Sequence, residues 1–174
     1  RKLDGFYQFN YSPAGVYRQA NWVATMRCPT TRFWGGEIYN KTNRFGRYQS
    51  HGTLEVLYEG SLAASGYPYK DKKSAAKGGW DWNVMPGTTT VHYTDWKSML
   101  PNGNNADRFD QWSHTTNFAG ALAWGDCGLF AAAFDQDDKW GSQRFVPTHL
   151  SFCKSVFAID GMLFSMGSLS LIHI

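Results

Sequence analysis

The stretch from Trp34 to Gly52 has the highest density of side chains that could do chemistry in this sequence. Its nineteen residues hold one carboxylate, two asparagines, three cations, two tyrosines and one histidine, namely Glu37, Asn40, Asn43, Lys41, Arg44, Arg47, Tyr39, Tyr48 and His51. Each of these groups would need a buried partner if the stretch lay inside a core. The composition therefore predicts an exposed functional loop that leads into a strand. A solvated connector bent at its glycines is the alternative.

Other residues offer weaker candidates for catalysis. A pair of carboxylates for glycoside hydrolysis could be formed by Glu37 with Asp81 or Asp126. The five histidines are not accompanied by the nucleophile elbow of a serine hydrolase. The acidic run 135–138 lacks the glycine and the terminal glutamate of a calcium loop. We therefore expect no metal site and no cofactor, and a divalent cation in a longer parent protein is an alternative that these residues do not indicate.

Aromatic residues make up 17% of the chain and charged residues 18%, and there are 18 glycines among 174 residues. This composition favours one β-rich domain. Trp80 and Trp112 could form the floor of a sugar subsite, and Arg44 could reach a sulfate or carboxylate. A net charge of +3 without a Lys/Arg run argues against a nucleic-acid partner, and no apolar run reaches the roughly 18 residues of a membrane span.

Alternating apolar and polar residues predict an all-β, mostly antiparallel fold, because no helical period persists for three turns. We expect a loop over 1–13, one strand over 16–28, a strand over 53–58, a turn at 85–87 followed by a strand over 88–93, and hairpins centred on Gly125-Asp126 and Asp160-Gly161. The three cysteines lie in apolar, strand-like runs without a CxxC spacing, which predicts buried and unreactive thiols at Cys28, Cys127 and Cys153.

Four segments, in order, resemble sequence blocks of the family 8 polysaccharide lyases. EIYNKTNRFGRY (37–48) is similar to the family pattern E-x-x-N-x-x-N-x-x-G-R-[WY], and WDWNVMPGTT (80–89) to W-x-W-x-x-[IM]-P-G-x-T. The segments 118–135 and 154–168 resemble two further blocks. The similarity is greater to chondroitin sulfate ABC lyases than to bacterial hyaluronate lyases.

The resemblance implies an incomplete antiparallel β super-sandwich of the galactose mutarotase-like kind, preceded in the parent protein by an α/α toroid. Such lyases cleave chondroitin sulfate, dermatan sulfate or hyaluronan by β-elimination and leave an unsaturated uronide. An Asn, a His, a Tyr and an Arg of the helical domain carry the reaction in the family. The resemblance assigns Glu37 as a supporting carboxylate and Asn40 as a substrate contact.

We accordingly expect residues 1–168 to be part of the central β domain, and the chain alone to be inactive without the helical domain, which is its expected protein partner. Residues 169–174 match the translated end of a sequencing adapter, and a genuine apolar terminal strand is the alternative. The parent would be a secreted or periplasmic bacterial monomer that binds a glycosaminoglycan and neither nucleic acid nor membrane. A non-catalytic carbohydrate-binding β-sandwich remains the competing interpretation.

Overall fold

The computed structural model describes residues 3–33, 37–38, 50–58, 84–90, 92, 110–111, 116–135 and 151–171, the side chains of 37–38, 110–111 and 169–171 excepted. These residues form ten strands: β1 (Gly5–Phe9), β2 (Ala14–Gln19), β3 (Trp22–Arg27), β4 (Glu37–Ile38), β5 (Thr53–Tyr58), β6 (Asp110–Gln111), β7 (Ala119–Trp124), β8 (Cys127–Asp135), β9 (Ser151–Ile159) and β10 (Met162–Leu171). No helix occurs in the described ranges, so the all-β prediction is confirmed.

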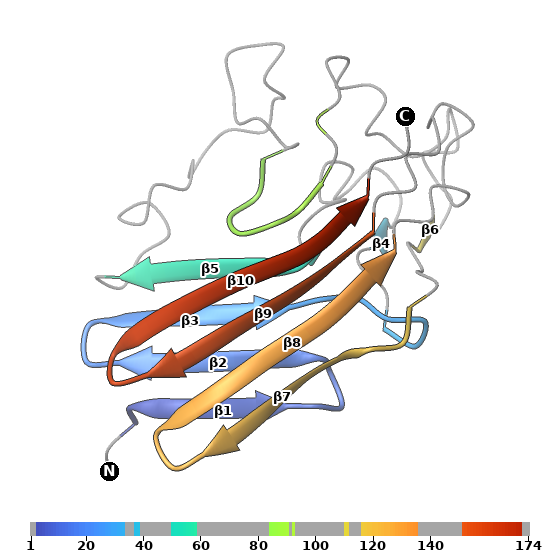
Figure 1. The fold of residues 1–174 in the computed structure, drawn as a ribbon. Helices are drawn as coiled ribbons and strands as arrows, with labels where there is room; N and C mark the ends of the chain where they lie inside the picture. The colour runs from blue at the N-terminus through green and yellow to red at the C-terminus, as the bar shows by residue number, and fades with distance from the viewer. Residues whose placement is uncertain are drawn as a thin grey trace.

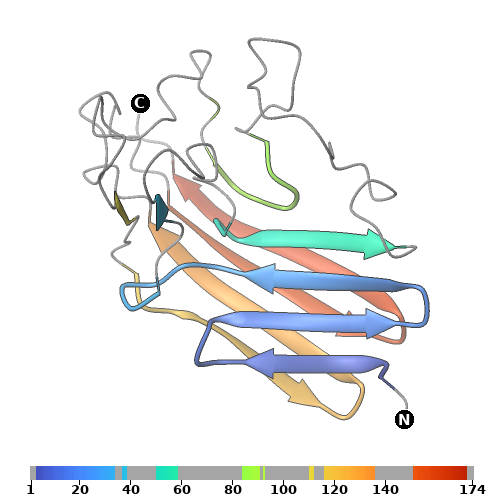
Figure 2. The same ribbon diagram turned by 180° about the vertical axis from the view of Figure 1, so that it is seen from behind.

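Two four-stranded antiparallel sheets face each other, one in the order β1-β2-β3-β5 and the other in the order β10-β9-β8-β7 (Figure 1). Seen from behind, the first sheet covers the second (Figure 2). The core lies between the sheets and consists of Phe6, Tyr17, Ala24, Met26, Cys28, Phe130, Ala132, Phe134, Phe152, Val156 and Ala158. The short strands β4 and β6 form a separate pair.

The region 16–28 is a hairpin, and the prediction of one continuous strand there was wrong. A turn at Ala20 and Asn21 separates β2 from β3, and Gln19 pairs with Trp22. Reversal over two residues places an odd-numbered residue of β2 on the same face as an even-numbered residue of β3. Tyr17 therefore lies inside, opposite Ala24. The inward residues are thus odd-numbered in β2 and even-numbered in β3, which one continuous strand could not produce.

The predicted N-terminal loop was also wrong, because β1 pairs with β2 from Gly5 opposite Arg18 to Phe9 opposite Ala14. Phe6 supplies the core contact of β1 and is 5% exposed. A strand with a single inward aromatic side chain shows no alternation of apolar and polar residues. This strand could therefore not be recognised in the sequence. The strand predicted over 53–58 is confirmed as β5.

Both C-terminal hairpins are confirmed. Gly125 turns the chain between β7 and β8 with φ +59°, and Asp160 and Gly161 turn it between β9 and β10 with φ of +48° and +75°. Two consecutive positive φ angles are typical of the type I′ turn that Asp-Gly favours. Strand β10 continues to Leu171, which faces Ser151 after an irregular pairing. The adapter origin of residues 169–174 stays a prediction.

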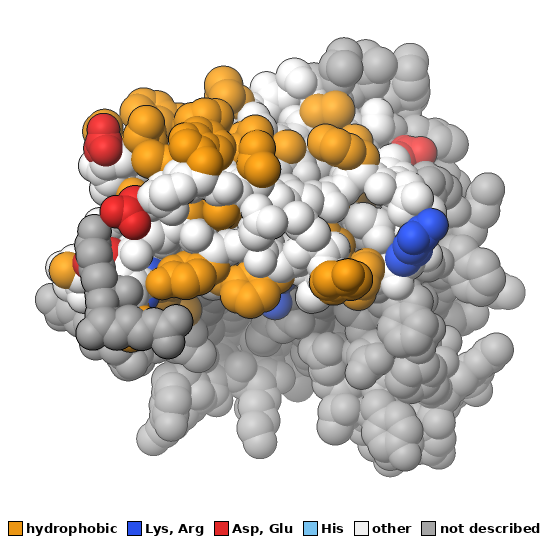
Figure 3. Space-filling view, turned by 90° about the horizontal axis from the view of Figure 1, so that it is seen from below, with side chains coloured by type: hydrophobic (Ala, Val, Ile, Leu, Met, Phe, Trp, Pro, Cys, Tyr) orange, Lys and Arg blue, Asp and Glu red, His pale blue; other side chains and the backbone are white. Residues whose placement is uncertain are grey.

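The edge strand β7 is contacted by one side chain of β1 and by one from the turn that follows β1. The Ala121 and Ala123 amides donate to Asn10 Oδ1 at 2.8 Å and to Gln8 Oε1 at 2.7 Å. These bonds occupy amides that would otherwise invite pairing with another strand. Figure 3 views the molecule from below, where hydrophobic side chains form two bands with polar and backbone atoms between them.

We expect the substitution Tyr17→Phe to lower the free energy of unfolding by about 1–2 kcal/mol. The Tyr17 hydroxyl is buried and accepts a 2.8 Å hydrogen bond from the Gly161 amide, which ties the first sheet to the β9–β10 turn. Removing it leaves that amide without its acceptor. Urea unfolding measures the loss, and Tyr11→Phe is the matched control because Tyr11 is 95% exposed. Equal midpoints for the two variants would contradict the role of this bond.

Candidate functional site

Glu37 lies on the short strand β4, which pairs with β6 through Glu37 opposite Gln111 and Ile38 opposite Asp110. The segments that flank this pair are also joined. The Thr31 amide donates to the Thr116 carbonyl at 2.9 Å, and the Thr31 hydroxyl donates to Asn117 Oδ1 at 2.9 Å. The backbone of Glu37 is therefore held next to Gln111, and Gln111 precedes Trp112 in the sequence.

A compact turn leads the chain out of β3 toward β4. The Thr30 hydroxyl accepts hydrogen bonds from the Arg32 and Phe33 amides at 3.2 Å each, and the Thr30 amide donates to the Phe33 carbonyl at 2.9 Å. Threonine favours such turns because its hydroxyl replaces a backbone acceptor. These bonds stabilise residues 30–33, directly before the polar stretch that begins at Trp34.

The second family motif contains the predicted tight turn, which is confirmed. The Thr88 amide donates to the Met85 carbonyl at 3.1 Å and Gly87 has φ +68°, as a type II turn with Pro at its second position requires. Residues 88–90 and His92 are not in a strand, so the strand predicted over 88–93 was wrong for these residues. Val91 and Tyr93 lie outside the described residues.

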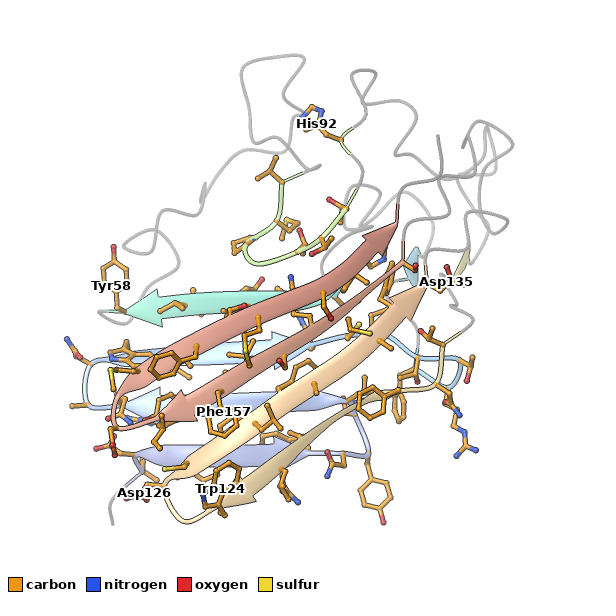
Figure 4. All side chains as sticks on the ribbon, viewed as in Figure 1. Tyr58, His92, Trp124, Asp126, Asp135 and Phe157 are labelled. Carbon is orange, nitrogen blue, oxygen red and sulfur yellow. The ribbon has the colours of Figure 1, made fainter. Side chains whose placement is uncertain are left out.

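The turn packs against β5 instead of extending into a strand. The Leu54 amide donates to the Pro86 carbonyl at 3.2 Å, and the Thr89 amide donates to the His51 carbonyl at 3.3 Å. A depression of about 350 Å³ beside it is lined by Val84, Met85, Thr88, Thr89, Thr90 and His92. His92 projects from this segment in Figure 4. Hydroxyl groups and an imidazole at an open surface are suited to hydrogen bonding with a sugar.

Lys154 links β9 to the bend at 50–52 and to the turn at 85–88. It was not among the site residues predicted from the sequence. Its Nζ donates to the Gly52 carbonyl at 3.1 Å and to the Gly87 carbonyl, and it lies 5.6 Å from the centroid of the Phe152 ring. Burial lowers the pKa of Lys154 from its ordinary value. The sequence does contain one feature that could have identified Lys154. It stands midway between the apolar residues Phe152 and Val156 in an alternating strand, where an inward apolar residue is expected.

His51 is a core residue, although it lies in the stretch predicted to be an exposed loop. It is 1% exposed, and its ring lies 4.7 Å from the Phe134 ring, centroid to centroid. A histidine enclosed in this way is not available to a substrate.

The hydrolase alternative with Asp126 was wrong. Asp126 lies in the β7–β8 turn, and Asp135 ends β8 nine residues further on (Figure 4). Nine strand residues span about 30 Å. Figures 1 and 2 place β4 near the Asp135 end, whereas paired carboxylates in glycosidases are about 5–10 Å apart.

The remaining predicted site residues lie outside the described residues, namely Asn40, Arg44, Trp80 and Trp112, as does the alternative carboxylate Asp81. Their roles stay predictions. Within the described ranges no group of three or more His, Cys, Asp or Glu side chains could hold a metal ion. The same ranges contain no helix that is long and apolar enough to cross a membrane.

The prediction of three buried thiols was correct only for Cys28. Cys127 is partly exposed and Cys153 is exposed on the outer face of β9. Burial raises the pKa of Cys28 to about 12, while a backbone hydrogen bond from Gly52 and the charge of Lys154 act in the opposite direction.

We therefore expect Cys153 to react with a thiol reagent in the native chain at neutral pH, and Cys28 to react only after unfolding in urea. The unfolded thiol ionises near pH 9.0 and the folded one near 12, so the contribution of Cys28 to stability is complete below pH 9.0 and is lost as the pH rises toward 12. Mass spectrometry of labelled peptides measures the reaction, with Cys28→Ala as control. Labelling of Cys28 at the rate of Cys153 would contradict its burial.

Comparison with known proteins identifies the family. The model of "polysaccharide lyase family 8, super-sandwich domain" matches residues 4–169. The chain belongs to polysaccharide lyase family 8. This confirms the predicted family and the super-sandwich fold.

Relatives of this family 8 chain include a chondroitin sulfate ABC endolyase of Proteus vulgaris, 36% identical over 166 residues, and a chondroitin sulfate ABC exolyase of Bacteroides thetaiotaomicron, 31% identical over 170 residues. The alignments cover 94% of the chain but only 15% and 16% of these relatives. A chondroitinase AC lyase structure matches with a TM-score of 0.68 at 20% identity, over 99% of this chain and 21% of the other chain. A Paenibacillus xanthan lyase structure matches with a TM-score of 0.62 at 18% identity, over 96% of this chain and 13% of the other chain. These structures support the fold.

Proposed function

We propose that this chain is part of the central β domain of a longer lyase that cleaves a uronic acid-containing glycosaminoglycan, chondroitin or dermatan sulfate or hyaluronan, by β-elimination. The observation that carries the proposal is the family 8 match over residues 4–169, together with two relatives above 30% identity whose names state that they act on chondroitin sulfate. The chain spans about one sixth of those relatives. The activity therefore belongs to the proposed parent, with the helical domain as the other wall of the site.

In the proposed reaction the proton at C5 of the uronate is removed and the glycosidic oxygen at O4 leaves, which creates a double bond in the uronide. The C5 proton is weakly acidic, so the uronate carboxylate must be neutralised and the developing enolate stabilised. A base and an acid must also be held at the two positions. These groups come from the helical domain, and none of the described residues is assigned to them.

Glu37 serves as a supporting carboxylate that orients and balances the charge of an arginine and a tyrosine on the opposite wall. Two features support this assignment: the backbone of Glu37 is held by pairing with Gln111, and the flanking Thr31 is bonded to Thr116 and Asn117. Asn40, Arg44, Trp80 and Trp112 are proposed to contact the sugar. The parent would act outside the cytoplasm as a secreted or periplasmic monomer, where its polymeric substrate is found.

A carbohydrate-binding β-sandwich without catalysis is the second candidate, because the open depression beside Thr88–Thr90 and His92 could bind sugar hydroxyls without any reaction.

The test is incubation of chondroitin sulfate with the full-length parent and, separately, with the 174-residue chain. The proposal predicts ultraviolet-absorbing unsaturated oligosaccharides from the parent and none from the chain. Binding without products from the parent would favour the binding module, and saturated products would favour a hydrolase.

A further inference from the structure

Lys154 is an unusual residue for its position in the sandwich. Its backbone lies opposite Ala132 of β8 and Gly167 of β10. Along β9 it has the same alternation as the buried residues Phe152, Val156 and Ala158, so it occupies an inward position. A charged ammonium group at such a position is unfavourable unless hydrogen bonds replace its water. The residue therefore needs an explanation beyond core packing.

The contacts of the ammonium group supply that explanation, because both of its acceptors are backbone carbonyls of other segments. Gly52 lies 102 residues from Lys154 in the sequence and Gly87 lies 67 residues away. The Phe152 ring adds a favourable aromatic contact below the charge. Lys154 thus joins β9, the bend at 50–52 and the turn at 85–88.

The geometry around these two carbonyls leaves little room for alternative arrangements. Gly52 and Gly87 both have φ +68°. A Cβ on Gly87 would lie 2.4 Å from the Leu54 nitrogen, and one on Gly52 would lie 3.0 Å from Phe152 Cε2 and 3.4 Å from Lys154 Cδ. Each carbonyl is therefore presented to Lys154 by a closely packed backbone, so that movement of either segment would break its bond.

We propose that Lys154 is a positioning residue that fixes the 50–52 bend and the 85–88 turn relative to β9. The bend ends the polar stretch that contains Glu37, and the turn ends the motif that contains Trp80. Lys154 thereby holds the substrate-facing end of the sandwich in one arrangement. This functional consequence rests on the proposed function, whereas the structural role does not.

The structural role is tested on the chain by amide hydrogen exchange in Lys154→Met. We expect the Leu54, Thr88 and Thr89 amides, which bond the turn to β5, to itself and to the bend, to exchange about tenfold faster than in the unsubstituted chain. The amides of Leu122 and Phe130 should not change. Arg27→Met is the matched control, because it removes a cation from β3 that pairs with Glu55 at 3.6 Å.

Unchanged exchange at the three amides would overturn the proposal, as would equal acceleration throughout the sheets, which indicates general destabilisation. In an active parent, Lys154→Met should lower kcat/KM on chondroitin sulfate about tenfold while Lys154→Arg restores part of it. Loss of protection at the three amides with unchanged kcat/KM would overturn only the functional consequence. A parent that forms no unsaturated products would refute the proposed function and leave the exchange result to decide the structural role.

Discussion

Replacing Gly128 by alanine is expected to lower the free energy of unfolding of this chain by roughly 3 kcal/mol. Gly128 begins the inward face of β8, and a Cβ built there lies 2.1 Å from Phe6 Cγ. The same ring occupies the space above Gly15, where a Cβ would lie 2.8 Å from Phe6 Cζ. The Phe6 ring is thus enclosed by glycines of both sheets and cannot move aside without leaving the core.

The measurement is the urea midpoint followed by tryptophan fluorescence, with Gly167→Ala as the control. Gly167 has no positive φ, and its Cβ would meet nothing closer than the Cys153 carbonyl oxygen at 3.9 Å. Combining Gly128→Ala with Phe6→Leu should recover part of the loss, because the smaller side chain vacates the overlap. Similar midpoints for Gly128→Ala and Gly167→Ala would contradict the close packing of β1 on β8.

Replacing Glu37 by glutamine should lower the lyase activity of the full-length parent about a hundredfold, a typical effect of misplacing catalytic groups. Glutamine keeps the size of the side chain and removes its charge, so under the proposed function the arginine and tyrosine of the helical domain would lose the carboxylate that orients them. The strand pair β4–β6 is held by backbone bonding, and the fold should not change.

Glu55→Gln is the matched control for Glu37→Gln. Glu55 lies on β5, where it accepts a hydrogen bond from the Thr25 hydroxyl at 3.4 Å and pairs with Arg27. Its substitution should leave the rate of product formation unchanged. Full activity of Glu37→Gln under the same conditions would refute the assigned role.

The parts of the fold that could be predicted from sequence depend on local signals. Gly125 and Asp160-Gly161 identify their turns because the backbone there has positive φ, which few residues adopt readily. The Ala20-Asn21 turn contains neither glycine nor proline, so one strand was predicted where the chain forms a hairpin. The alternating pattern identified β5 but missed β1 and the reversal between β2 and β3, and the family resemblance gave the assembly of the strands into a super-sandwich.

The site was less predictable because its contacts are distant in sequence. Pairing of Glu37 with Gln111 brings together two polar segments that no turn connects. The role of Lys154 depends on two carbonyls far away in the chain, which no spacing rule could reveal. Glu37 itself was found through a motif resemblance, since composition alone did not distinguish a functional loop from a solvated connector.

We propose above all that the parent of this chain breaks the glycosidic bond by elimination. Digestion of chondroitin sulfate in water enriched in heavy oxygen tests it most directly, because hydrolysis inserts an oxygen atom from water into the product and elimination does not. We predict product fragments that carry no heavy oxygen and are lighter than the hydrolysis products by one water. Heavy oxygen at the new reducing end, in saturated products, would contradict the claim.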